Sequence, residues 1–256
     1  MKSISGHFAV SMAANGIFVL AVLLATERPA EATAWDLQND WSNTLNPNGP
    51  WTYTDGAGDL FVEGSGSPTG GLTPQSYWAA PGNSAYPGWF QSTVNERGWD
   101  VGDIITYVAD GGYGFDYRSS AVSWTSPVSG FVTISGDAWY GFGTNGGIDE
   151  RLLDWRLSVN GTSLTHSGTP FGDGTGYYRN SPFLFSDGTG GPSVLQDIPV
   201  QPGTVITLNV SLDENSFAGY GGAAGIGFTI ATVPEPTSIA ILGLGCTGLF
   251  IRRRSS

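Results

Sequence analysis

The sequence predicts an all-β protein, an antiparallel β-sandwich of jelly-roll type, with helices only in its two end segments. Between residues 35 and 232, short runs that alternate apolar and polar side chains recur about every ten residues, a spacing typical of sandwich strands. The chain's 39 glycines and 15 prolines supply turn residues between these runs, and no helical period of useful length interrupts them. Two small β-domains divided near Gly98 are a weaker alternative, because neither half would bury enough surface without disulfides.

The expected strands begin with an edge strand at residues 35–42, where tryptophans alternate with polar residues, followed by a turn at residues 46–50. Residues 63–98 are rich in Gly, Pro, Ser and aromatic residues without clear periodicity, which predicts a long ordered loop system. Further strands are expected at residues 103–109, 120–125, 130–138, 152–159, 162–166, 194–200, 205–212 and 225–231.

Two β-hairpins are expected among these strands. Asn160-Gly161 separates the runs 152–159 and 162–166, and both residues tolerate the positive φ that a two-residue turn requires. Gln201-Pro202-Gly203 separates the runs 194–200 and 205–212, which predicts a second hairpin.

Residues 1–34 have the order of parts of a secretory signal peptide. Lys2 gives a positive start, residues 17–25 form a short apolar core, and Ala32-Thr33-Ala34 is a small-x-small cleavage site before Trp35. A lipoprotein signal would need a cysteine at this point, and none is present. We therefore expect export, with a domain at residues 35–232.

The composition of residues 35–232 excludes several partners. Five of the chain's 10 Lys and Arg residues and three of its 22 Asp and Glu residues lie in the end segments, so this region has five arginines, no lysine, 19 acidic residues and a formal charge of −14. Nucleic acids and anionic lipids both require cations that neutralise phosphate, so neither is an expected partner. Calcium is the natural counter-ion of such a surface.

Groups that carry out catalysis are scarce. The single cysteine is Cys246, and the single histidine of residues 35–232 is His166, so a closed zinc site is excluded and His166 is interpreted as a solvated turn residue. No Gly-x-Ser-x-Gly motif occurs, and the Glu-x-Asp-x-x-Glu strand of sandwich-type glucan hydrolases is missing. We predict no catalytic residues and no enzyme activity, and we regard a glycoside hydrolase as the least favoured alternative.

Aromatic residues near glycine-rich loops are candidates for stacking on sugar rings, although large aromatics also close the ends of sandwiches as core. The candidates are Trp78, Trp89, Trp139, Tyr140, Tyr177 and Tyr178, with Tyr86 and Tyr220 in similar positions.

Loop acids are candidates for binding calcium, against the alternative that they are simply solvated. The candidate ligands are Asp149, Glu150, Asp213 and Glu214. Two Asp-Gly-Thr-Gly segments, at residues 173–176 and 187–190, are interpreted as turns because they lack the spacing of a known calcium loop.

The C-terminal stretch, residues 233–256, combines three features. Val233 precedes the triplet Pro234, Glu235 and Pro236, residues 239–251 form an apolar run, and Arg252, Arg253 and Arg254 follow it. The prolines favour an extended, accessible segment, and the apolar run is shorter than the ~20 residues of a stable spanning helix. The arginines favour the cytoplasmic side of the membrane.

This order of parts resembles the PEP-CTERM sorting signal of exported bacterial proteins, whose tails are processed by exosortase enzymes. The stretch Trp35-Asp36-Leu37 and the later Asn46-Pro47-x-Gly-x-Trp51-x-Tyr53 also resemble the start of many such proteins. A plain C-terminal anchor that is never processed is the alternative, but it would need neither the Pro-Glu-Pro triplet nor so short a span.

The resemblance implies a protein that is exported, transiently anchored in the inner membrane through a short transmembrane segment, and then found at the cell surface or in the extracellular matrix. We expect a non-catalytic protein associated with exopolysaccharide, as in biofilms, with a membrane-embedded exosortase as its partner and extracellular polysaccharide as a further candidate partner. A calcium-assisted carbohydrate-binding module is the main alternative, and no other cofactor is expected.

Overall fold

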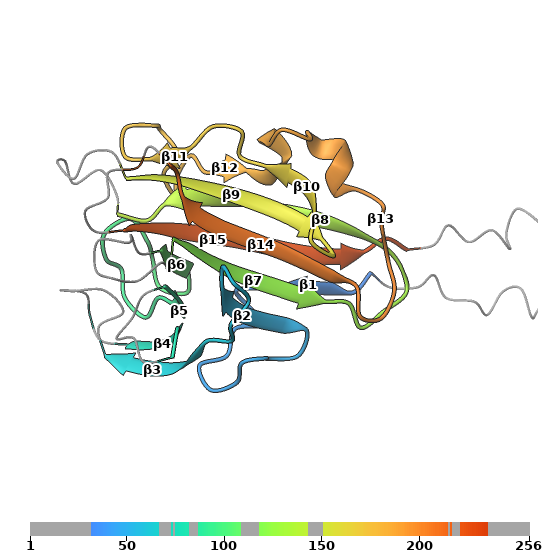
Figure 1. The fold of residues 1–256 in the computed structure, drawn as a ribbon, viewed down its shortest axis with the longest axis horizontal. Helices are drawn as coiled ribbons and strands as arrows, with labels where there is room; N and C mark the ends of the chain where they lie inside the picture. The colour runs from blue at the N-terminus through green and yellow to red at the C-terminus, as the bar shows by residue number, and fades with distance from the viewer. Residues whose placement is uncertain are drawn as a thin grey trace, which may run out of the picture. The chain divides into compact units, whose positions relative to one another are not determined.

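The structure is a computed structural model that describes residues 32–66, 73, 75–81, 87–108, 118–142, 151–214, 216 and 221–234. Residues Thr33–Val233 form one compact unit. Two antiparallel sheets are packed face to face in it, which confirms the predicted all-β sandwich (Figure 1). The predicted signal peptide, except for its last residues, and the tail from Glu235 onward lie outside the described residues.

The larger sheet has nine strands. Along its main path the strands are β12 (Phe183–Leu184), β8 (Gly130–Tyr140), β15 (Gly222–Thr232), β6 (Ile104–Val108), β5 (Gly88–Gln91), β4 (Gln75–Ala79) and β3 (Val62–Gly66). Two short strands join it from the side: β1 (Ala34–Asp36) pairs with β15, and β13 (Ile198–Val200) pairs with β8.

The smaller sheet has six strands. Its order is β10 (Thr162–His166), β9 (Leu152–Val159), β14 (Val205–Leu212), β7 (Ser119–Thr125) and β2 (Trp51–Asp55), and β11 (Phe171–Gly172) pairs with β9. From β6 to β9, and again from β13 to β15, the chain changes sheet at every strand. This crossing between layers gives the jelly-roll connectivity that the strand spacing predicted.

The predicted hairpin at Asn160-Gly161 is present, with φ of 48° and 78° at its two residues and β10 paired with β9. The second predicted hairpin is wrong. β13 pairs with β8 in the larger sheet, whereas β14 lies between β7 and β9 in the smaller one, so the turn after Gln201 carries the chain from one layer to the other. Local turn chemistry cannot distinguish these two outcomes.

Two other regions differ from the prediction. The expected loop system at residues 63–98 contains β3, β4 and β5. In β3, Gly64 leaves room for a large ring, because a Cβ there would lie 2.2 Å from the ring of Tyr77. The described part of the domain also contains two single-turn 3₁₀ helices, η2 (Phe185–Asp187) and η3 (Pro192–Leu195), where only strand or loop was expected. Pro192 begins η3, since proline is tolerated in a first helical turn, and η3 replaces the start of the strand predicted at 194–200.

Large aromatic side chains fill the space between the sheets. Trp51, Trp89, Trp124 and Trp155 are at most 1% exposed, and Trp35 of β1 packs 5.0 Å from Trp124, between ring centroids. Burying one such side chain stabilises the fold by on the order of 5 kcal/mol before the entropic cost of ordering it. The domain therefore holds together without disulfides, as residues 35–232 contain no cysteine.

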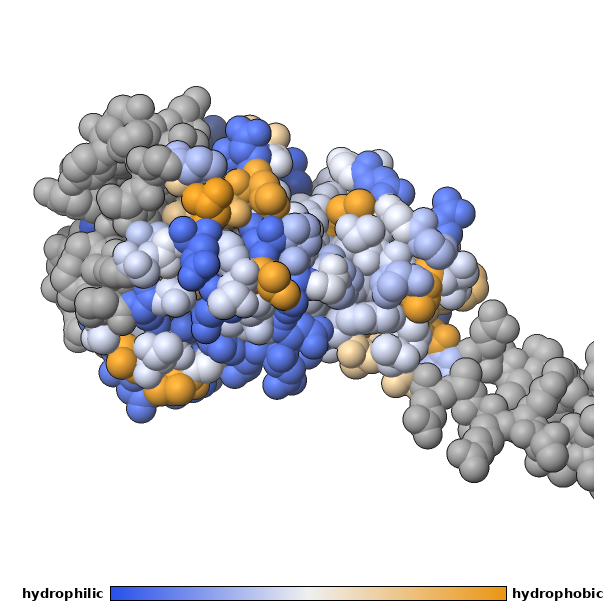
Figure 2. All heavy atoms as spheres, turned by 90° about the horizontal axis from the view of Figure 1, so that it is seen from below, coloured by the Kyte–Doolittle hydropathy of each residue, from blue (hydrophilic) through white to orange (hydrophobic). Residues whose placement is uncertain are grey.

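The outer face of the larger sheet carries a second hydrophobic cluster, because alternate residues of β4, β5 and β6 point away from the main core. It consists of Tyr77, Ala79, Phe90, Trp99, Ile105, Tyr107 and Ala223. On the face of the molecule shown in Figure 2, exposed hydrophobic side chains form small separate groups among polar ones.

Candidate functional site

The first hollow of the domain lies where β8 ends. Its volume is about 380 Å³, and we call it the tyrosine pocket. It is lined by Arg97, Gly98, Trp99, Asp100, Tyr140, Tyr178, Arg179 and Asn180. These residues come from the end of β8 and from two loops that are far apart in the sequence, residues 92–103 and 173–182.

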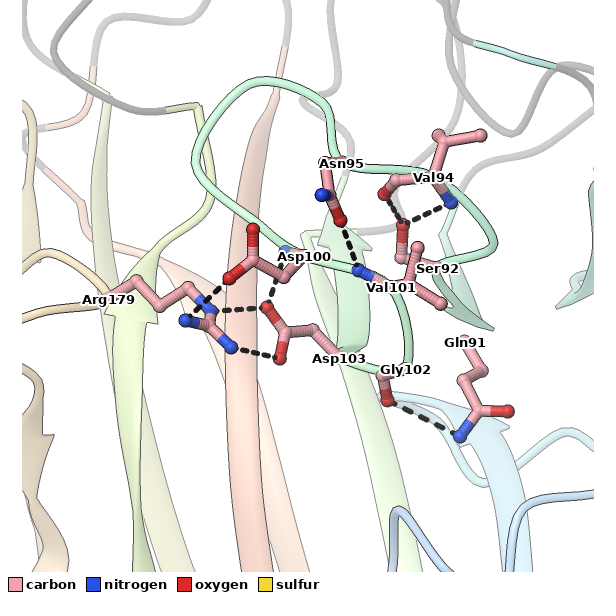
Figure 3. Close-up of polar contacts among 9 residues, drawn as sticks. All are labelled: Gln91, Ser92, Val94, Asn95, Asp100, Val101, Gly102, Asp103 and Arg179. Atoms are coloured by element: carbon pink, nitrogen blue, oxygen red, sulfur yellow. Dashed lines mark hydrogen bonds and ion pairs between the residues drawn. The ribbon is translucent and has the colours of Figure 1, made fainter.

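The loop between β5 and β6 forms one wall of the tyrosine pocket. It is closed by backbone bonds between Ser92 and Asp103 and between Gly102 and Ser92, and the side chain of Asn95 accepts a hydrogen bond from the Val101 amide at 2.8 Å (Figure 3). Trp99 fixes the loop to the domain because its ring is buried between Phe90 and Phe142. The wall is therefore ordered by packing and by hydrogen bonds.

Arg179 joins this wall to the opposite loop. Its Nε and Nη2 donate to the two carboxylate oxygens of Asp103, at 2.6 and 3.1 Å, and its Nη1 lies 2.8 Å from Oδ2 of Asp100 (Figure 3). The side chain of Asp103 is 7% exposed, whereas those of Asp100 and Arg179 are 52% and 40% exposed. Hydrogen bonding to Asp103 raises the pKa of Arg179, so this guanidinium stays charged.

The two tyrosines have different surroundings. Tyr140 is 2% exposed, and burial raises its pKa to about 12, so its phenol stays protonated and can donate a hydrogen bond. Tyr178 is half-buried, and its hydroxyl donates to Asp173 at 3.2 Å and accepts from the Gly174 amide at 3.1 Å. The segment at 173–176 thus acts as the turn that the sequence predicted, and it orients one wall of the pocket.

The second hollow, of about 650 Å³, lies over β9, β14 and β7 of the smaller sheet, and we call it the sheet-face groove. It is lined by Gly56, Arg118, Ser119, Asp154, Trp155, Arg156, His166, Ser167, Gly168, Pro170, Asn209, Ser211 and Asp213. Strand register places many of these side chains: Asn209 lies opposite Arg156, and Ser211 lies between Asp154 and Ser119.

Two carboxyl groups meet in the sheet-face groove. Asp154 and Asp213 both line it, close enough for the charge of Asp213 to act on Asp154. Burial, and then the neighbouring charge of Asp213, raise the pKa of Asp154, while a hydrogen bond from the Ser167 hydroxyl at 2.9 Å opposes this rise. His166 lines the same groove and contacts Thr189 through Nδ1 at 2.8 Å, so it lies at a strand end as predicted but packs against a neighbouring loop.

The few arginines of the domain gather at these two hollows. Arg97 and Arg179 line the tyrosine pocket, and Arg118 and Arg156 line the sheet-face groove. The fifth, Arg151, lies 5.1 Å from the centre of the Phe142 ring, and Arg97 lies 5.2 Å from the same ring. In a region with a formal charge of −14, the two hollows thus combine both signs of charge.

Most of the predicted stacking residues present no open ring face. Trp78, Trp89, Trp139 and Tyr140 are between 0% and 6% exposed, so they belong to the packed part of the domain. Trp139, for example, lies against β15, where a Cβ on Gly225 would come within 2.0 Å of its ring. The expectation that these four rings are available to a sugar is corrected, because Trp78, Trp89 and Tyr140 belong to the main hydrophobic core and Trp139 covers Gly225.

Tyr177 and Tyr178 are the two candidates that remain partly exposed. Tyr177 stacks on Phe183 with 4.4 Å between ring centroids, and Tyr178 lines the tyrosine pocket. Tyr86 and Tyr220 lie outside the described residues.

The four predicted calcium ligands lie in different surroundings. Asp149 and Glu150 lie outside the described residues, Glu214 is exposed, and Asp213 is 8% exposed and lines the sheet-face groove with Asp154. The part of the chain that the structure describes contains no group of three or more His, Cys, Asp or Glu residues that could hold a metal ion. Calcium binding stays a prediction.

Sequence reasoning missed Arg97, Arg179, Asp100, Asp103 and Asp154. No local pattern marks them, because they come from strands and loops that are far apart in the chain.

The C-terminal tail is identified by comparison with known families. Residues 232–254 match the PEP-CTERM protein-sorting motif. The chain carries a PEP-CTERM sorting signal. The motif indicates an exported protein that is transiently anchored in the membrane and processed by an exosortase.

The match begins inside the folded domain, because Thr232 is the last residue of β15. Of the predicted PEP-CTERM residues, Val233 and Pro234 are described, and Glu235, Pro236 and Arg252 to Arg254 lie outside the described residues. The described ranges contain no helix long and apolar enough to cross a membrane, and the predicted span at 239–251 lies outside them.

Other comparisons add little. No curated protein matches the chain significantly. A family 35 carbohydrate-binding module from Clostridium thermocellum aligns with 78% of this chain and 98% of its own length, at 10% identity. Its TM-score is 0.26, which is too low to carry an argument about fold or ligand.

Proposed function

We propose that this protein is a non-catalytic cell-surface or extracellular-matrix protein that is sorted by its PEP-CTERM signal and binds extracellular polysaccharide in the tyrosine pocket. The observation that carries the proposal is the arrangement of Tyr178 beside the Arg179–Asp100 ion pair in an open hollow. Membrane-embedded exosortase is the sorting partner, and the mature protein remains among secreted glycans.

The chemistry of the pocket suits a neutral sugar. Neighbouring hydroxyls of a pyranose both donate and accept hydrogen bonds, and a guanidinium next to a carboxylate offers both functions at a fixed spacing. Both Asp100 and Arg179 keep about half of their side-chain surface exposed, so they retain capacity for a ligand. Tyr178 adds an apolar ring surface that can pack on the C–H face of a sugar.

The location of the pocket also suits the binding of a large polysaccharide outside the membrane. The Val233 amide donates to the Phe131 carbonyl at the start of β8, whereas Tyr140 ends that strand. Nine residues of strand span about 30 Å. The pocket thus lies at the end of the domain remote from the point where the tail leaves, where a large polysaccharide has access.

The carboxyl pair in the sheet-face groove does not favour a hydrolase. Glycosidases that use two carboxyl groups keep them about 5 to 10 Å apart, so that a glycosidic bond or a water fits between them. In the groove, the Asp154 carboxylate instead accepts a hydrogen bond from the Ser167 hydroxyl at 2.9 Å and lies beside the charge of Asp213. A calcium-assisted version of sugar binding stays an alternative and is tested by the same experiment.

The test is retention of the purified full chain, in mild detergent, on exopolysaccharide from its native host and on neutral glucans, with calcium and with chelator. We expect retention of the wild type and its loss in Tyr178→Ala, with Tyr178→Phe intermediate because it keeps the ring. Asn209→Ala in the sheet-face groove is the matched control and should bind like the wild type. Absence of retention on every polysaccharide, or equal retention by Tyr178→Ala, would overturn the proposal.

A further inference from the structure

The sorting signal and the last strand of the sandwich share residues. The PEP-CTERM match starts at Thr232, and β15 ends at Thr232. Val233 is also held, because its amide donates to the Phe131 carbonyl at 2.8 Å. Pro234 is therefore the first residue of the motif outside the sheet, and no linker separates the motif from the folded domain.

The end of β15 is paired on both of its edges. Ile230 lies opposite Ile134 of β8 on one side and Trp35 of β1 on the other, and Ala231 lies opposite Thr133 and Ala34. Ile230 is fully buried. The N–H and C=O groups of these residues are thus engaged in the sheet.

β1 is fixed firmly to this end of β15. The Thr232 amide donates to the Thr33 carbonyl at 2.8 Å, and the Thr33 amide donates to the Thr232 hydroxyl at 2.8 Å. The Thr229 hydroxyl donates to the Asp36 carboxylate at 2.7 Å. Trp35 anchors the strand in the core through its contact with Trp124.

A protease that cuts a peptide chain usually binds the substrate as an extended strand and uses the backbone groups on either side of the cut. In the folded domain, the backbone N-terminal to Pro234 cannot offer these groups. We propose that the end of β15, residues 230–233, must detach from the sheet before the exosortase can cut the tail, so that folding of the domain and processing of the tail compete. This proposal does not depend on sugar binding.

How firmly the end of β15 is fixed in the sheet depends on whether the signal peptide has been removed. Cleavage at the predicted site after Ala34 would remove Thr33, and with it the three hydrogen bonds that join Thr33 to Thr232. The bond from Val233 to Phe131 would remain. Removal of the signal peptide thus weakens the contacts that fix the start of the sorting motif to the sheet. The signal peptide is therefore removed first, and the tail is processed second.

A spacer tests the proposal in the native host. Six residues of Gly-Ser repeat, inserted between Val233 and Pro234, free the backbone before the motif and keep its distance from the membrane segment unchanged. The same insert between Asn160 and Gly161 is the control, because that turn is exposed. We expect pulse-labelled full chain with the tail spacer to be processed about tenfold faster than the wild type, with no change for the control.

A disulfide that fixes the end of β15 to β8, which we call the lock, tests the proposal in the opposite direction. Thr232 and Val132 are opposite each other in β15 and β8. Their backbone pair is not hydrogen-bonded, and such pairs have Cα atoms about 4.5 Å apart, within the range that a disulfide spans. We expect Thr232→Cys/Val132→Cys, with Cys246→Ser to avoid mispairing, to be cut about tenfold more slowly by native-host membranes when oxidised than when reduced.

Combining the spacer with the lock should restore the rate, which distinguishes access from damage to the fold. Unfolding of the oxidised and reduced forms, followed by tryptophan fluorescence, provides the folding control. Each of three results would overturn the proposal. The oxidised and reduced forms are cut at the same rate, the spacer leaves processing unchanged or slows it, or the wild-type chain keeps its tail.

Discussion

The tyrosine pocket and the sheet-face groove contain similar groups but hold them in different ways. In the groove, Asp154, Arg156 and Asn209 stand on paired strands, so the backbone register sets their spacing. In the pocket, the residues other than Tyr140 come from two loops, and Arg179 with its two carboxylates joins these loops. We therefore expect the loss of one side chain to disturb the spacing of groups in the pocket more than in the groove.

The largest expected effect comes from the core under the groove. Trp155 is 1% exposed and packs against Phe183 and Phe185, with ring centroids 5.6 and 4.9 Å away. Trp155→Ala should lower the free energy of unfolding by about 3 to 5 kcal/mol, because it removes a large buried side chain and leaves a cavity. Urea denaturation measures this, with exposed Phe131→Ala as the control. A decrease in unfolding free energy smaller than that of the control would mean that the packing of Trp155 does not stabilise the sheet under the groove.

The pocket should respond most to Arg179→Ala. The change leaves the Asp103 carboxylate with little exposure and without its cation, and we expect a loss of about 1 to 3 kcal/mol in unfolding free energy, together with loss of polysaccharide retention. Arg179→Lys keeps the charge but not the two-pronged geometry, and should recover stability better than binding. Full binding by Arg179→Ala would show that the loops are ordered without the ion pair.

The groove should show the clearest dependence on pH. Because burial and Asp213 raise the pKa of Asp154 above the value of about 3.9 in an unfolded chain, the contribution of its proton to stability is complete below pH 4 and is lost as the pH rises through the raised pKa.

Asp154→Asn removes this loss, so its advantage over the wild type should grow from pH 4 to pH 7, to at most about 1 kcal/mol because the side chain is partly exposed. Urea midpoints across this pH range measure it, with exposed Asp187→Asn as the control. An advantage that shrinks as the pH rises would contradict the sign of the shift.

The smallest effect is expected on the polar outer face that carries the groove. The hydroxyls of Ser123 and Thr207 are hydrogen-bonded across β7 and β14 at 2.8 Å. Ser123→Ala should cost only a few tenths of a kcal/mol, since cross-strand pairs contribute roughly 0.2 to 1 kcal/mol. Polysaccharide retention should not change, and a marked loss of retention would assign the binding function to this face.

The comparison also shows what the sequence could predict. Strands with strict alternation and clear turns were predicted with their observed bounds: Leu152–Val159, Thr162–His166 and Val205–Leu212. β3, β4 and β5 were missed because their stretch shows no clear alternation; in β3, for example, Gly64 makes room for the ring of Tyr77 on β4, which leaves a gap in the pattern.

The candidate site was less accessible to prediction. The aromatic candidates were chosen for their glycine-rich neighbours, but in β15 and β3 the glycines accommodate buried rings. Arg179 and Asp103 are 76 residues apart, and no local pattern predicts their contact. The sorting signal could be predicted because its residues are contiguous, so that order along the chain is sufficient.

The pairing of β1 with β15 has a consequence for engineering. Ala34 and Ala231 are opposite each other, so the N- and C-terminal ends of the domain are neighbours in one sheet. A short linker could join them, and new chain ends could be opened at Asn160-Gly161, where both residues are exposed. Such a circularly permuted domain would keep both sheets while releasing the tail from its present position, and it would give a fusion partner a second point of attachment.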